Sequence, residues 1–557
     1  MKPSRLNQHN FFFLLREASA SAAPRRRLPP LHSLLVKLGL QPYARVHNAL
    51  IQAYAAAAPG LLADARKVFD GMSSRDTVSY NSMIHAYATS GDVTSARHIF
   101  DRAPERTPVT WTSMIAGLCR TGDVAAARRL FEEMPARDLV SWNAMMSGLV
   151  GNGRHAEALH LFRRMMAEED GGLVPNRGTV LSALAACAGA GALETGKWVH
   201  AFVERKRLFR WWDEFLGTAL LDMYAKCGAV ELALDVFNRL RRRNTCTWNA
   251  MINGLAMNGY SAKALDMFHR MEIDGTVVPD EVTFVGVLLA CSHGGFVEVG
   301  REHFYMIEKK YGVGLILEHY ACMVDLLARS GHPQEAHRII AGMPMKPDAV
   351  IWRALLGGCR LHKDVKMAET AISEMEATCS GDHVLLSNLY AAVGRCNGVE
   401  DVRSMMRNKG IEKVPGCSSI EINGSIHEFI SGDKSHPSYN EIRGKLAEIG
   451  SRMQLHGYVT ETAEVFYDVE EEEKEEALCH HSEKLAIAFG LIESPPNVAI
   501  RIVKNLRFCA DCHKFANCSK EDNTNITVVP ATRKMALVTL PDTQNENRVR
   551  IPLRCII

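Results

Sequence analysis

The stretch SYNSMIHAYATSGDVTSARHIFDRAPER, residues 79–106, decides the fold of most of this chain. Apolar residues recur from Tyr80 to Tyr87 at i, i+3, i+4 and i+7, which predicts one buried stripe on a helix. Gly91 can adopt the left-handed conformation that ends a helix, and Asp92 can cap the helix that follows. A second apolar stripe then runs from Val93 to Phe100. The stretch therefore predicts two antiparallel helices joined by a tight turn.

The glycine of this turn recurs along the chain at similar intervals. Its copies are Gly60, Gly91, Gly122, Gly153, Gly191, Gly228, Gly259, Gly295 and Gly331. Because one hairpin cannot bury its own apolar stripe, neighbouring hairpins must stack on one another. We therefore predict an all-α superhelix of about nine repeats over residues 44–348.

Composition excludes some classes of function. The 557 residues carry a net charge of only +2, which argues against charge-driven, non-specific binding of nucleic acid, and we expect no DNA partner. No stretch reaches the roughly 20 apolar residues of a membrane span, so we expect no membrane association. Cysteines are scattered through the repeats, for example Cys119, Cys187, Cys227, Cys291 and Cys322. We predict that these cysteines are reduced thiols in apolar surroundings.

The first 40 residues are typical of an organelle transit peptide. Residues 1–30 contain six basic side chains but one acidic side chain, Glu17, with serine and alanine between them. This composition does not distinguish the mitochondrion from the chloroplast. The alternative interpretation is an unstructured leader that has no targeting role.

The repeat lengths and phrases indicate which kind of repeat this is. Tetratricopeptide arrays keep to one length of about 34 residues. This chain instead mixes short intervals, such as Gly122 to Gly153, with longer ones, such as Gly153 to Gly191. Phrases such as SWNAMMSGLVGNGRHAEALHLFRRM (141–165) and TALLDMYAKCGAVELALDVFNRL (218–240) resemble the pentatricopeptide repeat family in its plant PLS class. The resemblance extends from about Ala44 to Lys520 and implies a right-handed α-solenoid that binds single-stranded organelle RNA.

The resemblance further implies that each repeat reads one base with two side chains. One is a polar residue early in the first helix, and the other is the last residue of the same repeat. These RNA-reading pairs are Asn48 with Asp76, Asn81 with Thr107, Thr112 with Asp138, Asn143 with Asn176, Thr218 with Asn244, and Asn249 with Asp280. With Y for a pyrimidine and N for any base, the implied target is U-Y-G-Y-N-A-U-N-N, followed a few nucleotides later by a cytidine.

Other recurring side chains in the repeats receive different interpretations. Aliphatic residues match family positions that sandwich the bases, namely Val78, Val109, Val140 and Val282. Recurring aromatic residues such as Trp111, Trp142 and Trp248 are instead predicted to form the core between repeats. A polar residue at the start of a helix can also be only a cap, which is the competing interpretation of the reading positions.

The repeats degenerate after Trp352, and residues 349–459 resemble the E and E-plus extensions of plant RNA-editing factors. Within this region, the alternating segment from Ile420 to Phe429 predicts a small mixed α/β region.

A metal-binding constellation follows the extension. CHHSEKLAIAFGL (479–491) precedes CADCH (509–513) in this part of the chain. One histidine, two cysteines and a nearby glutamate are the residues of a zinc nucleobase deaminase. The segment resembles the DYW deaminase domain over residues 460–520. That resemblance implies His481, Cys509 and Cys512 as zinc ligands and Glu483 as the general acid and base.

The resemblance to the DYW domain stops after about Lys520. We expect residues 521–557 to be an unrelated, disordered tail. The family's second zinc site would use His513, but its other ligands have no counterpart here, so we expect one zinc ion. Whether the module deaminates is left open by the residues alone.

Three functions remain from the sequence. The leading hypothesis is an organelle factor for cytidine-to-uridine RNA editing, which uses its own zinc module or a deaminase recruited in trans with other editing-complex proteins. The first alternative is a non-catalytic RNA-binding factor for processing, splicing or stability. The second alternative is a helical scaffold that binds proteins, which the polar reading pairs disfavour.

Overall fold

The computed structural model describes residues 24–37, 43–57, 61–167, 173–206, 214–375, 380–411, 415–455, 478, 480–495, 498–505, 510–518 and 526–530. The chain divides into two compact units, Met1–Ala186 and Cys187–Ile557, and each is described by itself. Within the described ranges, the helices are all too short or too polar to cross a membrane.

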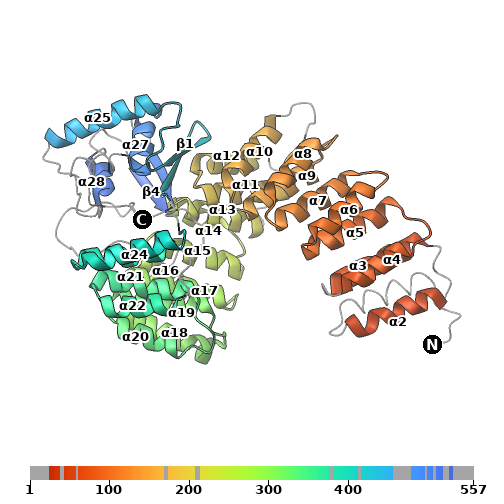
Figure 1. Ribbon diagram of the computed structural model, residues 1–557, viewed down its shortest axis with the longest axis horizontal. Helices are drawn as coiled ribbons and strands as arrows, with labels where there is room; N and C mark the ends of the chain where they lie inside the picture. Colours follow the sequence, from red (N-terminus) through yellow and green to blue (C-terminus); the bar gives the residue numbers. More distant parts are fainter. Residues whose placement is uncertain are drawn as a thin grey trace. The chain divides into compact units, whose positions relative to one another are not determined.

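Antiparallel helix pairs build the first unit (Figure 1). They are α3 (Ala44–Ala57) with α4 (Leu62–Asp70), α5 (Thr77–Ser90) with α6 (Val93–Arg102), α7 (Pro108–Arg120) with α8 (Val124–Glu133), and α9 (Leu139–Gly151) with α10 (His155–Ala167). Helix α2 (Pro24–Lys37) lies within the predicted leader and packs on α3, where His32 meets Tyr54 edge to face. The targeting role of residues 1–40 stays a prediction.

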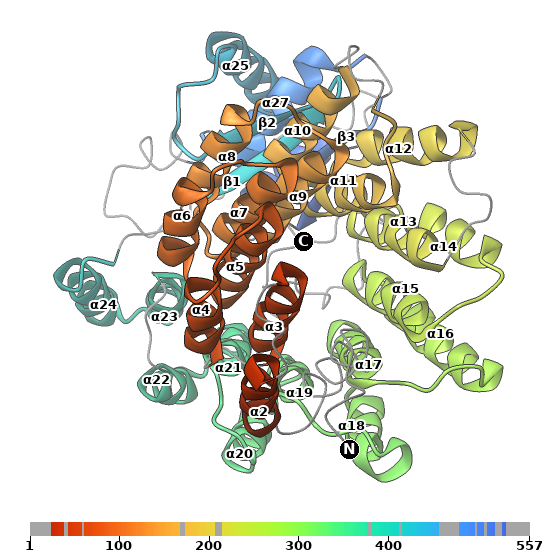
Figure 2. The same ribbon diagram turned by 90° about the vertical axis from the view of Figure 1, so that its right-hand side faces the viewer.

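The second unit continues the series of pairs. Helix α11 (Arg177–Ala190) crosses the boundary between the two units, and α12 (Leu193–Lys206) follows it in the chain. The pairs within the second unit are α13 (Glu214–Lys226) with α14 (Val230–Arg239), α15 (Thr245–Met257) with α16 (Ser261–Asp274), α17 (Glu281–Gly294) with α18 (Val297–Tyr311), and α19 (Leu317–Arg329) with α20 (Pro333–Ala341). The degenerate repeats form two more pairs, α21 (Ala349–His362) with α22 (Val365–Glu374) and α23 (Ser380–Ala392) with α24 (Cys396–Asn408). From α13 to α24 the pairs follow one another along an arc (Figure 2). The predicted α-solenoid is confirmed.

The predicted turn chemistry is also confirmed. Gly91 ends α5 in the left-handed conformation with φ of 83°, and the Asp92 side chain accepts a hydrogen bond from the Ser95 amide at the start of α6. Gly122 and Asp123 repeat this arrangement between α7 and α8. The turn is therefore set by the same two residue types in successive repeats.

Aromatic contacts join each pair to the next. The rings of Phe100 and Trp111 pack edge to face with centroids 5.1 Å apart, and those of Phe131 and Trp142 do so at 5.0 Å. Trp142 is fully buried. The recurring aromatic residues therefore form the core between repeats, as the sequence predicts.

The last elements form a small α/β module. Its sheet has the order β2-β1-β3-β4, made of β1 (Cys417–Ile422), β2 (Ser425–Ile430), β3 (Ile500–Lys504) and β4 (Ile526–Pro530). Strand β1 pairs antiparallel with both β2 and β3, and β3 pairs parallel with β4. Asn423 and Gly424 both have positive φ, which is the geometry of a two-residue hairpin turn.

Two helices, α25 (Tyr439–Leu455) and α27 (Ser482–Glu493), pack with this sheet around one apolar core. Gly490 lets α27 approach the sheet closely, because a Cβ there would lie 2.8 Å from Ile420 and 2.9 Å from Ile500. Helix α28 (Ala510–Cys518) packs beside α27.

Strand β4 corrects one prediction. The sequence predicts that residues 521–557 are disordered and unrelated to the module, but Ile526 to Pro530 pair with β3 along the whole strand. Ile526 is buried in the same core as Ile500 and Ile502. The β-branched run favours a strand, but its pairing with β3 depends on a tertiary contact that a local pattern does not reveal.

Candidate nucleic-acid interface and metal centre

The structure brings most predicted reading pairs into direct contact. In four pairs the asparagine Nδ2 donates to an oxygen of the partner side chain. The distances are 3.1 Å for Asn48 with Asp76, 3.3 Å for Asn81 with Thr107, 3.0 Å for Asn143 with Asn176, and 2.8 Å for Asn249 with Asp280. These residues are 26 to 33 positions apart in sequence. The fold therefore places each pair together.

Two predicted pairs do not form such a bond within the described residues. Thr112 Oγ1 is buried without a hydrogen-bond partner there, although Asp138 begins the next first helix. Thr218 Oγ1 lies 2.7 Å from Thr247 Oγ1 instead of contacting Asn244. Both exceptions have threonine at the first reading position, whose side chain is one atom shorter than asparagine.

The last residue of a repeat also caps the following helix. The side chains of Asp76, Asp138, Asn244 and Asp280 each accept a hydrogen bond from a backbone amide three residues later. Burial raises the pKa of Asp76, but hydrogen bonds from Ser79 and Asn48 outweigh this effect and hold the pKa below its usual value. Asp76 and Asp280 therefore cap a helix and contact the asparagine of their reading pair at the same time.

Aliphatic side chains lie exposed beside the pairs. Val78, Val109, Val140 and Val282 are between 51% and 60% exposed, and all four occupy the second position of a first helix. Isolated exposed valines are common, but recurrence at one position in several repeats is not explained by helix packing.

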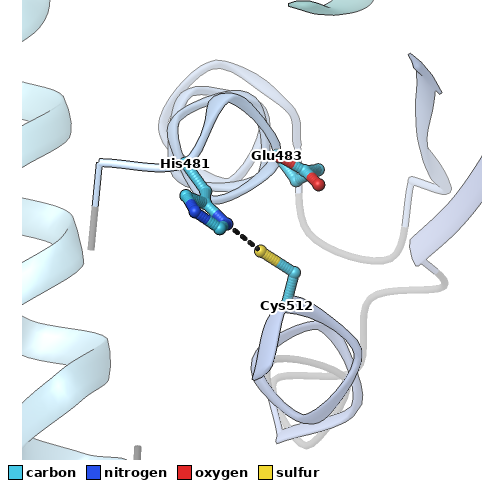
Figure 3. Close-up of side chains that lie close together, drawn as sticks. All are labelled: His481, Glu483 and Cys512. Carbon is cyan, nitrogen blue, oxygen red and sulfur yellow. Dashed lines mark hydrogen bonds between the residues drawn. The ribbon is translucent and has the colours of Figure 1, made fainter. Parts of the chain in front are cut away.

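A candidate metal-binding cluster lies between α27 and α28 (Figure 3). His481 is the residue before α27, Glu483 lies in the first turn of that helix, and Cys512 lies on α28. Ligand atoms of these three residues lie within 4.8 Å of one another, and His481 Nδ1 is 3.4 Å from Cys512 Sγ. Cys509 and its predicted role lie outside the described residues.

This geometry fits zinc. Zn–N and Zn–S bonds of about 2.05 and 2.3 Å at a tetrahedral angle separate the two ligand atoms by about 3.6 Å. The 3.4 Å between His481 Nδ1 and Cys512 Sγ is close to that value. A cysteine–histidine donor set is also one that zinc prefers.

Buried polar contacts hold Glu483 within this cluster. Its carboxylate accepts a hydrogen bond from Ser482 Oγ at 3.0 Å and forms an ion pair with Lys504 at the end of β3. Ser482 Oγ also lies 2.9 Å from Ser418 Oγ on β1. Lys484, which follows Glu483 on α27, forms an ion pair with Asp511 at 2.6 Å, and both of these side chains are buried.

Family models match both regions of the chain. Pentatricopeptide repeat models match residues 78–106, 105–135, 140–169, 218–245 and 243–293, the E motif matches 362–421, the E+ motif matches 426–453, and the DYW family of nucleic acid deaminases matches 457–536. The chain is a pentatricopeptide repeat protein. In this pentatricopeptide repeat protein the DYW match continues to residue 536, so the predicted end of the resemblance near Lys520 is too early.

Relatives of this pentatricopeptide repeat protein come from Arabidopsis thaliana. One named as mitochondrial is 39% identical over 486 residues, which are 87% of this chain and 64% of the relative. One named as chloroplastic is 47% identical over 346 residues, which are 62% of this chain and 47% of the relative. The chain spans about half to two thirds of the length of such relatives. The crystal structure of maize PPR10 is 18% identical with a TM-score of 0.40, covering 73% of this chain and 70% of that chain.

Sequence reasoning missed the lysine partner of Glu483. Lys504 ends the buried strand Ile500–Lys504, where it follows Ile500 and Ile502 on one face. A lysine on the apolar face of a strand is a signal for a buried acidic partner, because an unpaired charge there is costly.

Proposed function

We propose that this protein binds single-stranded RNA of a plant organelle in a sequence-specific manner and selects a cytidine for conversion to uridine. The observation that carries the proposal is the direct contact between both predicted reading side chains in four repeats. The match to the DYW family of nucleic acid deaminases and the histidine–cysteine cluster support the conversion step. The mitochondrial and chloroplastic names of relatives support an organelle location.

Paired amides and carboxylates suit the recognition of bases. An asparagine offers two donors and one carbonyl acceptor, whereas an aspartate offers only acceptors. Different pairs therefore present different patterns to the edge of a base, one repeat for each nucleotide. Because the net charge is only +2, affinity depends on these specific contacts more than on attraction to phosphate.

The C-terminal module has side chains suited to deamination. The reaction replaces the C4 amino group of cytosine with the oxygen of water and releases ammonia. Zinc, when held by His481, Cys509 and Cys512, makes a water nucleophilic near neutral pH. Glu483 would serve as the general base toward that water and as the general acid toward the departing amino group. Its ion pair with Lys504 requires the carboxylate form, which is the form that accepts a proton.

Base recognition is tested by Thr112→Asn in the full chain. The RNA probe is a synthetic oligonucleotide with the sequence U-C-G-C-A-A-U-A-A, together with versions changed at the third nucleotide. We expect the variant to prefer a pyrimidine where the parent protein prefers G, measured as dissociation constants in gel-shift titrations. Probes changed at the fourth nucleotide serve as the internal control. An unchanged preference at the third nucleotide would contradict the proposal.

Conversion is tested with zinc-loaded full-length protein and a longer RNA that carries a cytidine downstream of the same sequence. We expect one zinc ion per chain, and we expect Glu483→Gln to retain RNA binding while losing roughly 100-fold or more in turnover. RNA binding without turnover in the parent protein would instead support a non-catalytic role in processing, splicing or stability. It would also support recruitment of a deaminase in trans, which adding an active deaminase would reveal.

A further inference from the structure

A third side chain contacts the reading residues in several repeats. It lies three positions after the last residue of the repeat, in the first turn of the next first helix. Threonine occupies this position four times, and we name these residues the following threonines: Thr110, Thr179, Thr247 and Thr283. All four are fully buried.

The contact is the same wherever the first reading residue is asparagine and a following threonine is present. Thr179 Oγ1 donates a hydrogen bond to Asn143 Oδ1 at 2.7 Å and accepts one from the backbone N–H of Asn176 at 3.2 Å. Thr110 contacts Asn81 Oδ1 at 2.6 Å, and Thr283 contacts Asn249 Oδ1 at 2.6 Å. The arrangement therefore recurs in both compact units.

Such a contact fixes which way an amide faces. A side-chain amide can exchange its oxygen and nitrogen by rotating half a turn, and this reverses its pattern of donors and acceptors. In Asn143 the oxygen is held by Thr179, while one N–H is held by Asn176. The second N–H has no protein acceptor in the part of the chain that the structure describes. The free group is therefore a donor, which suits the acceptor atoms of a pyrimidine.

Two repeats with serine at the same position lack this contact and provide a comparison. Ser79 Oγ donates to Asp76, and Asn48 Oδ1 is left without a partner among the described side chains. Ser141 Oγ donates to the Asp138 backbone oxygen at 2.8 Å and leaves Thr112 without a partner in the same set. Serine lacks the methyl group of threonine, which restricts rotation about χ1, and in these two repeats the hydroxyl turns to the last residue of the repeat instead of the first reading residue.

We propose that the following threonines are positioning residues that set the strength of base discrimination by holding the first reading residue in one orientation. The proposal rests on the proposed RNA-binding function. A first reading residue that contacts a following threonine should distinguish between bases more strongly than one whose repeat is followed by serine. Thr179 is the most suitable residue to test, because its reader Asn143 is only half-buried.

The experiment compares the full chain with Thr179→Val, which keeps the branched shape and removes the hydroxyl. Gel-shift titrations use U-C-G-C-A-A-U-A-A and three versions changed at the fourth nucleotide. We expect the ratio of affinities for C over G at that nucleotide to fall about fivefold, which corresponds to the loss of one hydrogen bond. Thr179→Ser should give an intermediate ratio, because it keeps the hydroxyl without the methyl group.

The matched control is Ser141→Ala, which removes a hydroxyl at the equivalent position without a contact to the reader. It should leave the preference at the third nucleotide unchanged. An unchanged ratio in Thr179→Val would overturn the proposal, and so would an equal loss of affinity for all four probes, because that outcome indicates only lower stability. If the parent protein prefers no base at any position, the RNA-reading function itself fails.

Discussion

The reading pairs of the repeats and the cluster at α27 differ in how the chain assembles them. Each reading pair is built from neighbouring hairpins whose residues are 26 to 33 positions apart. The cluster instead depends on single contacts that do not recur along the chain: Glu483 of α27 pairs with Lys504 of β3, and the neighbouring Ser482 contacts Ser418 of β1, 64 positions away. Repeats can therefore change one at a time, whereas a change at the cluster affects three segments together.

Loss of a core aromatic residue should affect the repeats most and leave the cluster intact. We expect Trp142→Ala to lower the free energy of unfolding by about 4 kcal/mol, because it removes a fully buried indole that packs on Phe131. Denaturant titration followed by circular dichroism measures the loss, and metal analysis should show unchanged zinc content. Trp198→Ala is the matched control, since Trp198 is 46% exposed and stacks on Phe202, and it should cost about half as much or less. Equal losses of unfolding free energy in the two variants would contradict the role of Trp142 in the core between repeats.

The opposite test removes the lysine beside Glu483. Lys504→Met leaves a buried carboxylate unpaired, and we expect a loss of about 3 kcal/mol in the stability of the module. Limited proteolysis of the module and thermal melts measure it, while RNA preference should not change.

A second change should restore much of that loss. Combining Lys504→Met with Glu483→Gln removes the unpaired charge, and the double variant should be more stable than Lys504→Met alone. Lys445→Met breaks an exposed pair with Glu448 and should cost less than about 1 kcal/mol. A loss from Lys445→Met as large as that from Lys504→Met would contradict the assigned role of burial.

A smaller effect is expected at the turns of the repeats. Asp123→Ala removes the cap of α8, where the carboxylate accepts a hydrogen bond from the Ala126 amide at 2.9 Å. We expect a loss of about 1 kcal/mol in denaturant titrations. Asp101→Ala removes an exposed aspartate that caps no helix and should change stability by less than about 0.5 kcal/mol. If both variants are equally stable, the turn does not depend on its cap.

The smallest perturbation is chemical labelling. Burial raises the pKa of the Cys291 and Cys359 thiols to about 12, so both stay protonated and enclosed at pH 8. Cys246 is exposed. In the native protein, iodoacetamide should label Cys246 well before Cys291 and Cys359, as judged by mass spectrometry of peptides. Cys246→Ser removes that early signal and provides the control. Early labelling of Cys291 would show that the repeats open more easily than their packing indicates.

Much of the repeat array could be predicted because its determinants are local. Gly91, Asp92 and the apolar spacing around them specify a hairpin within a single repeat, and the structure confirms that hairpin. Four of the six predicted reading pairs are in contact, and their role in reading RNA stays a prediction. The exceptions at Thr112 and Thr218 depend on the length of one side chain, which a pattern of polar positions does not resolve.

The module is harder to predict because its contacts do not recur at a regular spacing, as those of the repeats do. The spacing from His481 to Cys512 indicated the metal cluster, and the structure brings these two side chains together. The partner of Glu483 and the pairing of β4 with β3 were missed. Lys504 on the apolar face of its strand indicates an acidic partner but does not identify it, and the pairing of β4 follows from which segments become neighbours in the sheet.

The last residue of a repeat both caps the next helix and belongs to a predicted reading pair, which limits how the specificity for RNA bases can evolve. Asp76 and Asp280 each cap a helix and also contact the asparagine of their reading pair. Only a few short polar residues satisfy the first requirement well. A lineage that needs a new target can therefore draw on a small alphabet of replacements, and larger side chains that could distinguish bases would weaken the next hairpin.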